Sequence, residues 1–259
     1  MKLEIIEKEK HIIAIKPVGM HTTYKNSQDT SDCAVKFITE KYPDLLSVPS
    51  KKPREGGLLY RLDQDTSGVL IFAKSQDEYN RLFSLQQENM LMKKYHAVCT
   101  VAEGFYSSQL KPADFRNMLD KAHAIADVTP PSEFLRDTDK SRAGDKYFKI
   151  DYPVGHSKKT GKRMIAVKTS KYKTSGSPRS ARTFIKISKD SANPSVAYVE
   201  AYITKAMRHQ IRVHLSAVGL PIIGDSLYYP NSVSLPKDYS TNRLMLNCSG
   251  VYEIQNGLG

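Results

Sequence analysis

The most informative stretch of the chain is Tyr60-Arg61-Leu62-Asp63-Gln64-Asp65-Thr66-Ser67-Gly68, followed by the apolar run Val69-Leu70-Ile71-Phe72-Ala73. Side chains of an extended segment alternate between two faces, so we expect Arg61 and Asp63 on one face and Leu62 on the other. Thr66-Ser67-Gly68 predicts a tight turn. A carboxylate repels phosphate, and in a basic protein a carboxylate beside an arginine therefore indicates chemistry.

The charge of the chain points to a polyanionic partner. The 259 residues include 39 lysines and arginines against 27 acids, a net charge of +12, and the pI is about 9.4. A basic surface of this size favours nucleic acid, although a basic surface without a partner is the alternative. Residues 156–189 hold eleven lysines and arginines and no acid. This basic strand and loop region predicts phosphate contacts and salt-sensitive binding, with a solvated loop as the alternative.

The cysteines and the hydropathy of the sequence indicate the cellular location of the protein. The three cysteines Cys33, Cys99 and Cys248 are far apart and match no disulfide or zinc spacing, so we expect reduced thiols. The first ten residues are too charged for a signal peptide, and no apolar run reaches the ~18 residues of a membrane helix. These features predict a cytoplasmic protein without membrane contact.

Periodicity and turn residues predict an α+β protein with more strands than helices. Strands are expected over 3–15 (two), 94–101 (half-buried), 147–189 (two or three), 196–204 and from 244 onwards. Helices are expected over 31–42, 75–89 with a Ser75–Glu78 capping box, 115–125, and 208–218 with Gly219 as the residue after the helix. Because the strands follow one another in hairpins, the sheet should be mixed and mostly antiparallel.

Four blocks in order resemble the RluA-type RNA pseudouridine synthases. The segment from Arg61 to Gly68 is similar to the family's R-L-D-x-x-T-S-G signature. The other three blocks are Lys16-Pro17-Val18-Gly19-Met20, similar to K-P-x-G; Lys94-Tyr95-His96-Ala97-Val98, similar to K-x-Y-x-A/V; and His209-Gln210-Ile211-Arg212-Val213-His214-Leu215 with Gly219, Pro221, Gly224 and Asp225, similar to H-Q-I-R-V-H-x-x-x-x-G-x-P-x-x-G-D. The blocks span residue 16 to about residue 229.

The resemblance implies a long, bent sheet around a central cleft, with helices on its outer face. Residues 1–259 would form one catalytic domain without the N-terminal S4-type RNA-binding domain of many relatives, so the catalytic domain itself would capture RNA. Residues 104–146 match no block of the family, and we interpret them as an insertion.

The resemblance also implies a site and a reaction, the isomerisation of uridine in structured RNA to pseudouridine. Asp63 would act on ribose C1′, Arg212 would pair with it in a bidentate contact, and Tyr95 would stack on the uracil or assist proton transfer. Because the reaction is an isomerisation, no cofactor or metal is expected. Asp63 could instead cap the turn, Tyr95 could be a core residue and Arg212 a phosphate contact, although Asp65 is the better turn acid.

Further residues are expected to contact the RNA, which would be a stem-loop of ribosomal or transfer RNA. Arg61 resembles the arginine that takes the place of the flipped base. The other expected contacts are Lys16, Arg208, His209, Lys158, Lys159, Lys162 and Arg163. His209 and His214 are expected on one helix, five residues apart, and therefore not as a metal pair. The protein is expected to be a monomer.

The sequence departs from the family at two places. Ala206-Met207-Arg208 stands where the family usually has G-R-T, which displaces the arginine by one position, and Tyr60 stands where many relatives have histidine. Two other functions stay open. One is an RNA-binding or assembly protein of the same fold without catalysis. The other is a nuclease in which Asp63 and Asp65 hold Mg²⁺.

Overall fold

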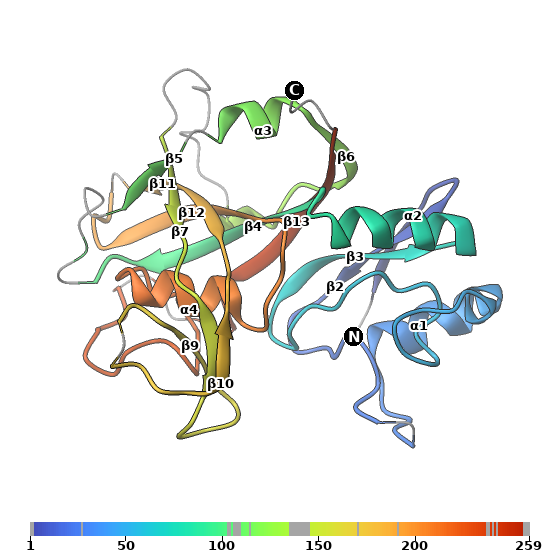
Figure 1. Cartoon of the computed structure of the whole chain (residues 1–259), viewed down its shortest axis with the longest axis horizontal. Coiled ribbons are helices and arrows are strands. Elements are labelled where there is room, and N and C mark those ends of the chain that lie inside the picture. The colour runs from blue at the N-terminus through green and yellow to red at the C-terminus, as the bar shows by residue number, and fades with distance from the viewer. Residues whose placement is uncertain are drawn as a thin grey trace.

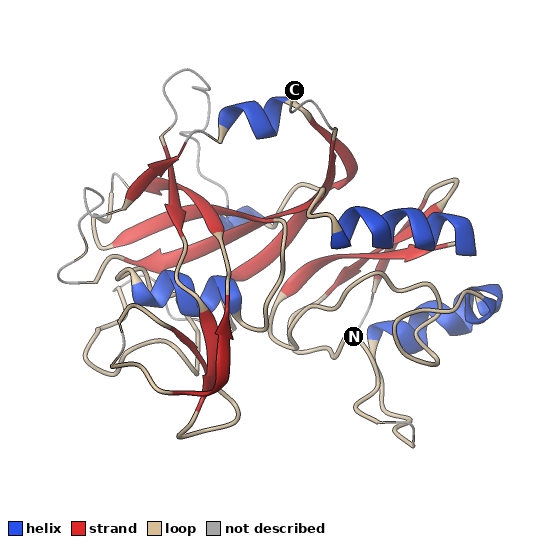
Figure 2. Cartoon of the chain, in the orientation of Figure 1, coloured by secondary structure: helices blue, strands red, loops and turns tan. Residues whose placement is uncertain are grey.

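The computed structural model describes residues 3–26, 28–102, 105, 110–113, 115–134, 146–169, 171–190, 192–236, 239, 241 and 243–255. Most of the strands form one long sheet, with a second, small sheet beside it (Figures 1 and 2). Within the described residues, no helix combines the length and the apolar character that crossing a bilayer would require.

Nine strands form the path of the large sheet, in the order β1-β2-β3-β13-β4-β12-β11-β7-β5. Their bounds are β1 Glu4–Glu7, β2 His11–Lys16, β3 Ser67–Ala73, β4 Leu91–Thr100, β5 Lys111–Ala113, β7 Tyr147–Ile150, β11 Thr183–Lys189, β12 Val196–Ile203 and β13 Leu246–Ile254. Among the described strands, β13 and β3 form the one parallel pair, and the other pairs are antiparallel. The expected mixed, mostly antiparallel α+β fold is confirmed.

The core follows the middle of this sheet. All seven residues of β3 are buried, as the apolar run after Gly68 requires. β4 is buried along nearly its whole length, so the expected half-buried strand is wrong. The reason is that β4 lies between β13 and β12 in the interior of the sheet. Each large apolar side chain buried in this way stabilises the fold by about 1.5–3 kcal/mol.

The helices lie against particular strands. Helix α1 spans Ala34–Lys41 and contacts β2, α2 spans Gln76–Gln87 and contacts β3 and β4, and α4 spans Gln210–Ala217 and contacts β9 and β11. The Ser75 hydroxyl accepts a hydrogen bond from the Glu78 amide, as the capping box predicts. The Glu78 carboxylate accepts hydrogen bonds from Arg81, so its side chain is used within the helix.

Residues 115–125 do not form the single helix that their apolar spacing predicts. Helix α3 covers only Arg116–Asp120, and β6 follows at Ala122–Asp127 and pairs with β13. β3 meets only the first residues of β13, so the edge of β13 beyond Cys248 is open for β6. Pairing of this edge outweighs the local helical pattern. Short helical turns also occur at Pro43–Ser47 and Ser132–Phe134, and residues 135–145 lie outside the described residues.

The basic region folds largely as strands. β8 (Val154–Ser157), β9 (Met164–Ala166) and β10 (Thr174–Arg179) form a small sheet in the order β10-β8-β9. Residues 175–178, which read as a loop from their Ser-Gly-Ser-Pro composition, belong to β10. Figure 1 shows this sheet beside α4, extending away from the large sheet.

Candidate active site

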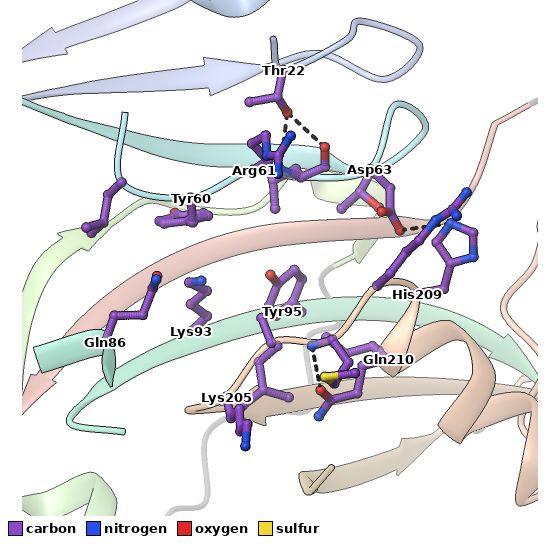
Figure 3. A pocket seen from close by; sticks show the side chains of 18 of the residues that line it. Thr22, Tyr60, Arg61, Asp63, Gln86, Lys93, Tyr95, Lys205, His209 and Gln210 are labelled. Carbon is purple, nitrogen blue, oxygen red and sulfur yellow. Dashed lines mark hydrogen bonds and ion pairs between the residues drawn. The ribbon is translucent and has the colours of Figure 1, made fainter. Parts of the chain in front are cut away.

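A cavity of about 840 Å³ opens between the segment around Asp63, the inner end of β4 and the start of α4 (Figure 3). Among the described residues, nine lysines and arginines line it, together with a single carboxylate, that of Asp63. The cations are Lys25, Lys51, Lys52, Arg61, Lys93, Arg179, Lys205, Arg208 and Arg212. A cavity with this excess of positive charge attracts a polyanion and leaves one anionic group for chemistry.

The segment that carries Asp63 is extended and fixed at its centre. Leu62 donates a backbone hydrogen bond to the Thr22 hydroxyl (3.1 Å), and this hydroxyl donates to the Leu62 carbonyl (2.8 Å). All three residues line the cavity, but Leu62 is buried, whereas Arg61 is exposed and Asp63 is partly exposed, so the alternation expected from the sequence is confirmed by burial. The turn closes where the Thr66 amide donates to the Asp63 carbonyl. Asp63 is therefore presented to the cavity by a rigid segment.

Lys16, an expected RNA contact, is buried in the structure. Its side chain is 0% exposed, and the ammonium donates hydrogen bonds to the carbonyls of Pro17, Met20 and Gln64 at 2.9–3.0 Å. Burial lowers the pKa of Lys16 to about 8. A buried ammonium with three acceptors has no donor left for phosphate. Lys16 thus ties the loop after β2 to the turn after Asp63.

Gly68 lets this turn enter the sheet directly. Its φ of +120° is a conformation that residues with a Cβ rarely adopt, and an added Cβ would lie 2.0 Å from the Cys248 carbonyl oxygen. Glycine therefore permits β3 to begin against β13 only a few residues after Asp63.

Arg212 has a different principal partner from the one expected. Its guanidinium donates two hydrogen bonds to Asp225, from Nε (2.8 Å) and from Nη2 (2.7 Å). The contact with Asp63 is longer, 3.7 Å from Nη1 to Oδ2. The bidentate pair expected with Asp63 is thus made with Asp225, and the third nitrogen points to Asp63. Both members of the Arg212–Asp225 pair are buried, so the guanidinium has a fixed orientation.

The predicted helix over 208–218 begins two residues late, at Gln210, because His209 has a φ of +54°. Its predicted end is confirmed, since Gly219 has φ +85° and the amides of Gly219 and Leu220 donate to the carbonyls of Ser216 and Leu215. His209 and His214 therefore do not share the helix. His214 is fully buried between Thr183 and the Tyr152 carbonyl, and has a structural role.

His209 lies beside Asp63, with 3.9 Å between Nε2 and Oδ2. Its Nδ1 is 2.9 Å from the Tyr228 hydroxyl, which also accepts the Met164 amide hydrogen bond. The Tyr228 hydroxyl hydrogen can therefore go to Nδ1, which places the ring hydrogen on Nε2 toward Asp63. Burial lowers the pKa of His209, and the charge of Asp63 opposes this only in part. Asp63 thus faces two donors, the charged guanidinium of Arg212 and the neutral imidazole of His209.

Two aromatic rings and a lysine line the inner wall of the cavity (Figure 3). Tyr95 and Lys93 lie two residues apart on β4 and face the same side, and Tyr60 lies opposite Lys93 with its hydroxyl bonded to the Val69 carbonyl. Burial, with the neighbouring Cys248 and Asp63, raises the pKa of Tyr95 well above its usual value. The phenol is therefore neutral at physiological pH and can act as a hydrogen-bond donor.

The expected RNA contacts fall into two groups. Arg61, Arg208 and His209 line the cavity, and Arg61 and Arg208 are exposed there. Lys158, Lys159, Lys162 and Arg163 are exposed on the connection between β8 and β9 and are not among the cavity residues. We call these four the basic hairpin. It lies on the small sheet whose strand β10 ends at Arg179, which does line the cavity.

Two residues of the site have no role in the sequence-based prediction. Asp225 appears in the sequence analysis only as the last residue of a family block. The sequence feature that could have indicated its role is the glycine before it. Gly224 has φ +76°, and a Cβ on it would lie 1.8 Å from the Arg243 carbonyl oxygen, so the chain turns sharply just before Asp225. Lys93 stands two residues before Tyr95, where the K-x-Y spacing places its lysine. The sequence-based alignment of this block used Lys94, which pairs with Glu200.

Fold and cavity together define a class of protein: an α+β domain with a bent sheet and one carboxylate in a basic cavity. The human protein described as RNA pseudouridylate synthase domain containing 1 has this fold. Its solved structure matches with a TM-score of 0.59 at 17% identity, over 95% of this chain and 76% of the human chain.

The sequence comparison shows the family. Residues 10–217 match the profile described as RNA pseudouridylate synthase, and the chain belongs to this family, as its RluA-type motifs indicate. An uncharacterized RNA pseudouridine synthase of Chloroflexus aurantiacus is 26% identical over 83% of this chain and 51% of its own length. Ribosomal large subunit pseudouridine synthase D of Pseudomonas aeruginosa is 21% identical over 88% of this chain and 54% of its own length. tRNA pseudouridine synthase C of Yersinia pestis is 25% identical over 96% of this chain and 80% of its own length. The chain spans about half the length of the first of these relatives.

Proposed function

We propose that this chain is an RNA pseudouridine synthase that isomerises specific uridines of ribosomal or transfer RNA. One observation carries the proposal: Asp63 is the single carboxylate among the residues lining a cavity with nine cations, and it faces Arg212. The names of the relatives include both ribosomal and transfer RNA enzymes. Residues 1–259 would act as one catalytic domain, with 104–146 as an insertion.

Asp63, Arg212 and Tyr95 would be the catalytic residues. The reaction breaks the bond from ribose C1′ to N1 of the base and forms a bond from C1′ to C5. Positive charge develops at C1′ when the first bond breaks, and the Asp63 carboxylate would attack this carbon or stabilise its charge. Arg212, held by Asp225, would keep the carboxylate ionised and aimed, and the Tyr95 ring would stack on the uracil.

The uridine would leave its stack to reach Asp63, which costs a few kcal/mol. The cavity of about 840 Å³ has room for a nucleoside. Arg61 is exposed at its wall, two residues before Asp63 in sequence, and would take the place of the flipped base. Arg208 and the basic hairpin would contact phosphates. We further propose a cytoplasmic monomer, since Cys33, Cys99 and Cys248 are buried free thiols that suit a reducing compartment.

The test is carbodiimide mapping of pseudouridine in ribosomal and transfer RNA from a deletion strain and its parent. A site absent from the deletion strain should return with the wild-type gene and not with Asp63→Asn. Purified Asp63→Asn should bind RNA at least as tightly as wild type, because the substitution keeps the shape and removes a charge that repels phosphate. If wild type and Asp63→Asn both bind RNA and no site depends on the gene, the chain is the RNA-binding protein without catalysis.

A further inference from the structure

Lys93 is a buried cation in the inner wall of the cavity. Only 3% of the residue is exposed, and its side chain points into the cavity from β4, on the same face as Tyr95 (Figure 3). Its Nζ lies 3.8 Å from the centroid of the Tyr60 ring. The Tyr60 hydroxyl donates to the Val69 carbonyl at 2.7 Å, so this ring is fixed. The ammonium is thus held in place by the face of an immobile ring.

Among the described residues, no carboxylate or carbonyl accepts a hydrogen bond from the Lys93 ammonium. Lys16, the other buried lysine facing this region, donates to three carbonyls, and Lys94 pairs with Glu200 at 3.7 Å. Cys248, whose charge would favour the ammonium, is a neutral thiol because burial raises its pKa to about 11. A buried charge without a partner destabilises a fold, so an ammonium kept in this state indicates a role toward a ligand.

The proposed reaction creates a matching negative charge. When the C1′–N1 bond breaks, its electron pair leaves with the base, and the negative charge is shared by N1, O2 and O4 of the uracil. In the proposed function Asp63, with Arg212 beside it, acts on the ribose side of this bond. Neither offers a counter-charge to the base, because Arg212 is already committed to Asp225 and Asp63 is itself an anion.

We propose that Lys93 is a further catalytic residue, which donates a hydrogen bond from its ammonium to a carbonyl oxygen of the uracil and stabilises the negative charge on the detached base. This inference rests on the proposed function. It assigns a residue to the uracil side of the C1′–N1 bond, whereas Asp63 acts on the ribose side. The electron pair then moves to C5, which bonds to C1′. C5 loses its proton and N1 gains one, so that the product is an isomer of the substrate and Lys93 is unchanged.

The experiment compares wild type with Lys93→Met, which removes the charge and keeps the length of the side chain. The substrate is the RNA stem-loop found by the mapping above, labelled with tritium at C5 of its uridines, because C5 releases its proton when the product forms. Under single-turnover conditions Lys93→Met should lower the rate of tritium release by about 10²-fold, the usual cost of removing one donor to a developing anion. Its affinity for the RNA should stay within a few-fold of wild type.

Two further variants separate catalysis from structure. Lys94→Met is the matched control, since Lys94 is the next residue of the same strand and lies outside the cavity, and it should keep the wild-type rate. Lys93→Arg stays charged at every accessible pH. The kcat/KM of wild type should therefore fall above about pH 8, where the ammonium deprotonates, and that of Lys93→Arg should not. A catalytic lysine also predicts that Lys93→Met melts no lower than wild type, because an unpaired buried charge is removed.

Equal rates for wild type and Lys93→Met would overturn the inference while leaving the proposed function intact. A lower melting temperature of Lys93→Met, with a rate that recovers on cooling, would also overturn it, because the role would then be structural. A wild-type protein that releases no tritium would contradict the proposed function, and the role of Lys93 would fall with it.

Discussion

Arg212 is oriented by Asp225 before it meets Asp63. The two hydrogen bonds from Arg212 to Asp225 measure 2.8 and 2.7 Å, whereas the contact to Asp63 measures 3.7 Å. Asp225 also accepts hydrogen bonds from the amides of Leu227 and Tyr228, which fix the carboxylate in turn. The charge beside Asp63 is thus positioned by a residue that is not among those lining the cavity. The first prediction concerns this residue.

Asp225→Asn should lower both stability and activity. The amide keeps the shape of the carboxylate but removes the charge of the bidentate pair and leaves the buried guanidinium only the longer contact to Asp63. Breaking a buried pair of this kind costs about 3–5 kcal/mol of unfolding free energy. Arg212 would also lose its orientation toward Asp63, and the rate of pseudouridine formation should fall. Urea unfolding followed by circular dichroism measures the first effect. Asp65→Asn, at an exposed acid of the same turn as Asp63, is the control, and a comparable loss there would refute the assignment.

Lys16→Met tests whether this lysine is a structural residue or an RNA contact. The variant removes three hydrogen bonds from a charged donor to backbone carbonyls, and the unfolding free energy should fall by about 3 kcal/mol or more. The slope of log K against log salt concentration for RNA binding should stay unchanged, since no phosphate contact is lost. A slope reduced by about 0.7–0.9 with unchanged stability would restore the original expectation of an RNA contact.

The basic hairpin should add affinity and not chemistry. Lys158→Gln/Lys159→Gln should weaken RNA binding and reduce the salt slope by about 1.5, the value for two phosphate contacts. The single-turnover rate at saturating enzyme should stay at the wild-type value. Lys8→Gln/Lys10→Gln removes the same charge from the exposed turn between β1 and β2 and is the matched control. Equal weakening by both pairs would mean that net charge alone, and not the hairpin, attracts the RNA.

The stability of the wild type relative to Lys93→Met should depend on pH in a defined direction. Burial lowers the pKa of Lys93 from 10.5 to about 8, so between these values the unfolded chain binds more protons than the folded chain. The contribution of this group to stability therefore rises with pH across that window. Below pH 8 the variant should be more stable by up to about 3 kcal/mol, and the difference should disappear by pH 10.5. Urea unfolding at pH 7, 9 and 10.5 checks this, and a constant difference would contradict it.

The local features of the fold were predictable because they depend on neighbours in the sequence. The alternation that places Arg61 and Asp63 together and buries Leu62 follows from backbone geometry alone. The Ser75 cap and the end of α4 at Gly219 follow from the groups that a helix terminus leaves unpaired. In each case the information lies within a few residues, and the structure bears it out.

The wrong predictions concern contacts between distant segments. The apolar spacing over 115–125 suits a helix, but the open edge of β13 takes residues 122–127 as a strand. The K-P-x-G resemblance suggested an RNA contact at Lys16, but the Asp63 turn supplies the Gln64 carbonyl to its ammonium. β13 and the Asp63 turn are both distant in sequence from the residues whose structure they determine. No local sequence pattern could therefore predict these contacts.

The residue types of the candidate site could be predicted from the sequence alone, because they depend on residue order and composition. The signals were an arginine and a carboxylate two residues apart, four family blocks in order, and an excess of positive charge. Three features depended on how β4, α4 and residues 224–225 pack: which arginine nitrogen meets Asp63, which carboxylate holds that arginine, and which buried lysine faces the cavity. Hydrogen-bond partners are chosen by position in space over a few ångströms, and only the folded chain brings residues 63, 93, 212 and 225 to that range.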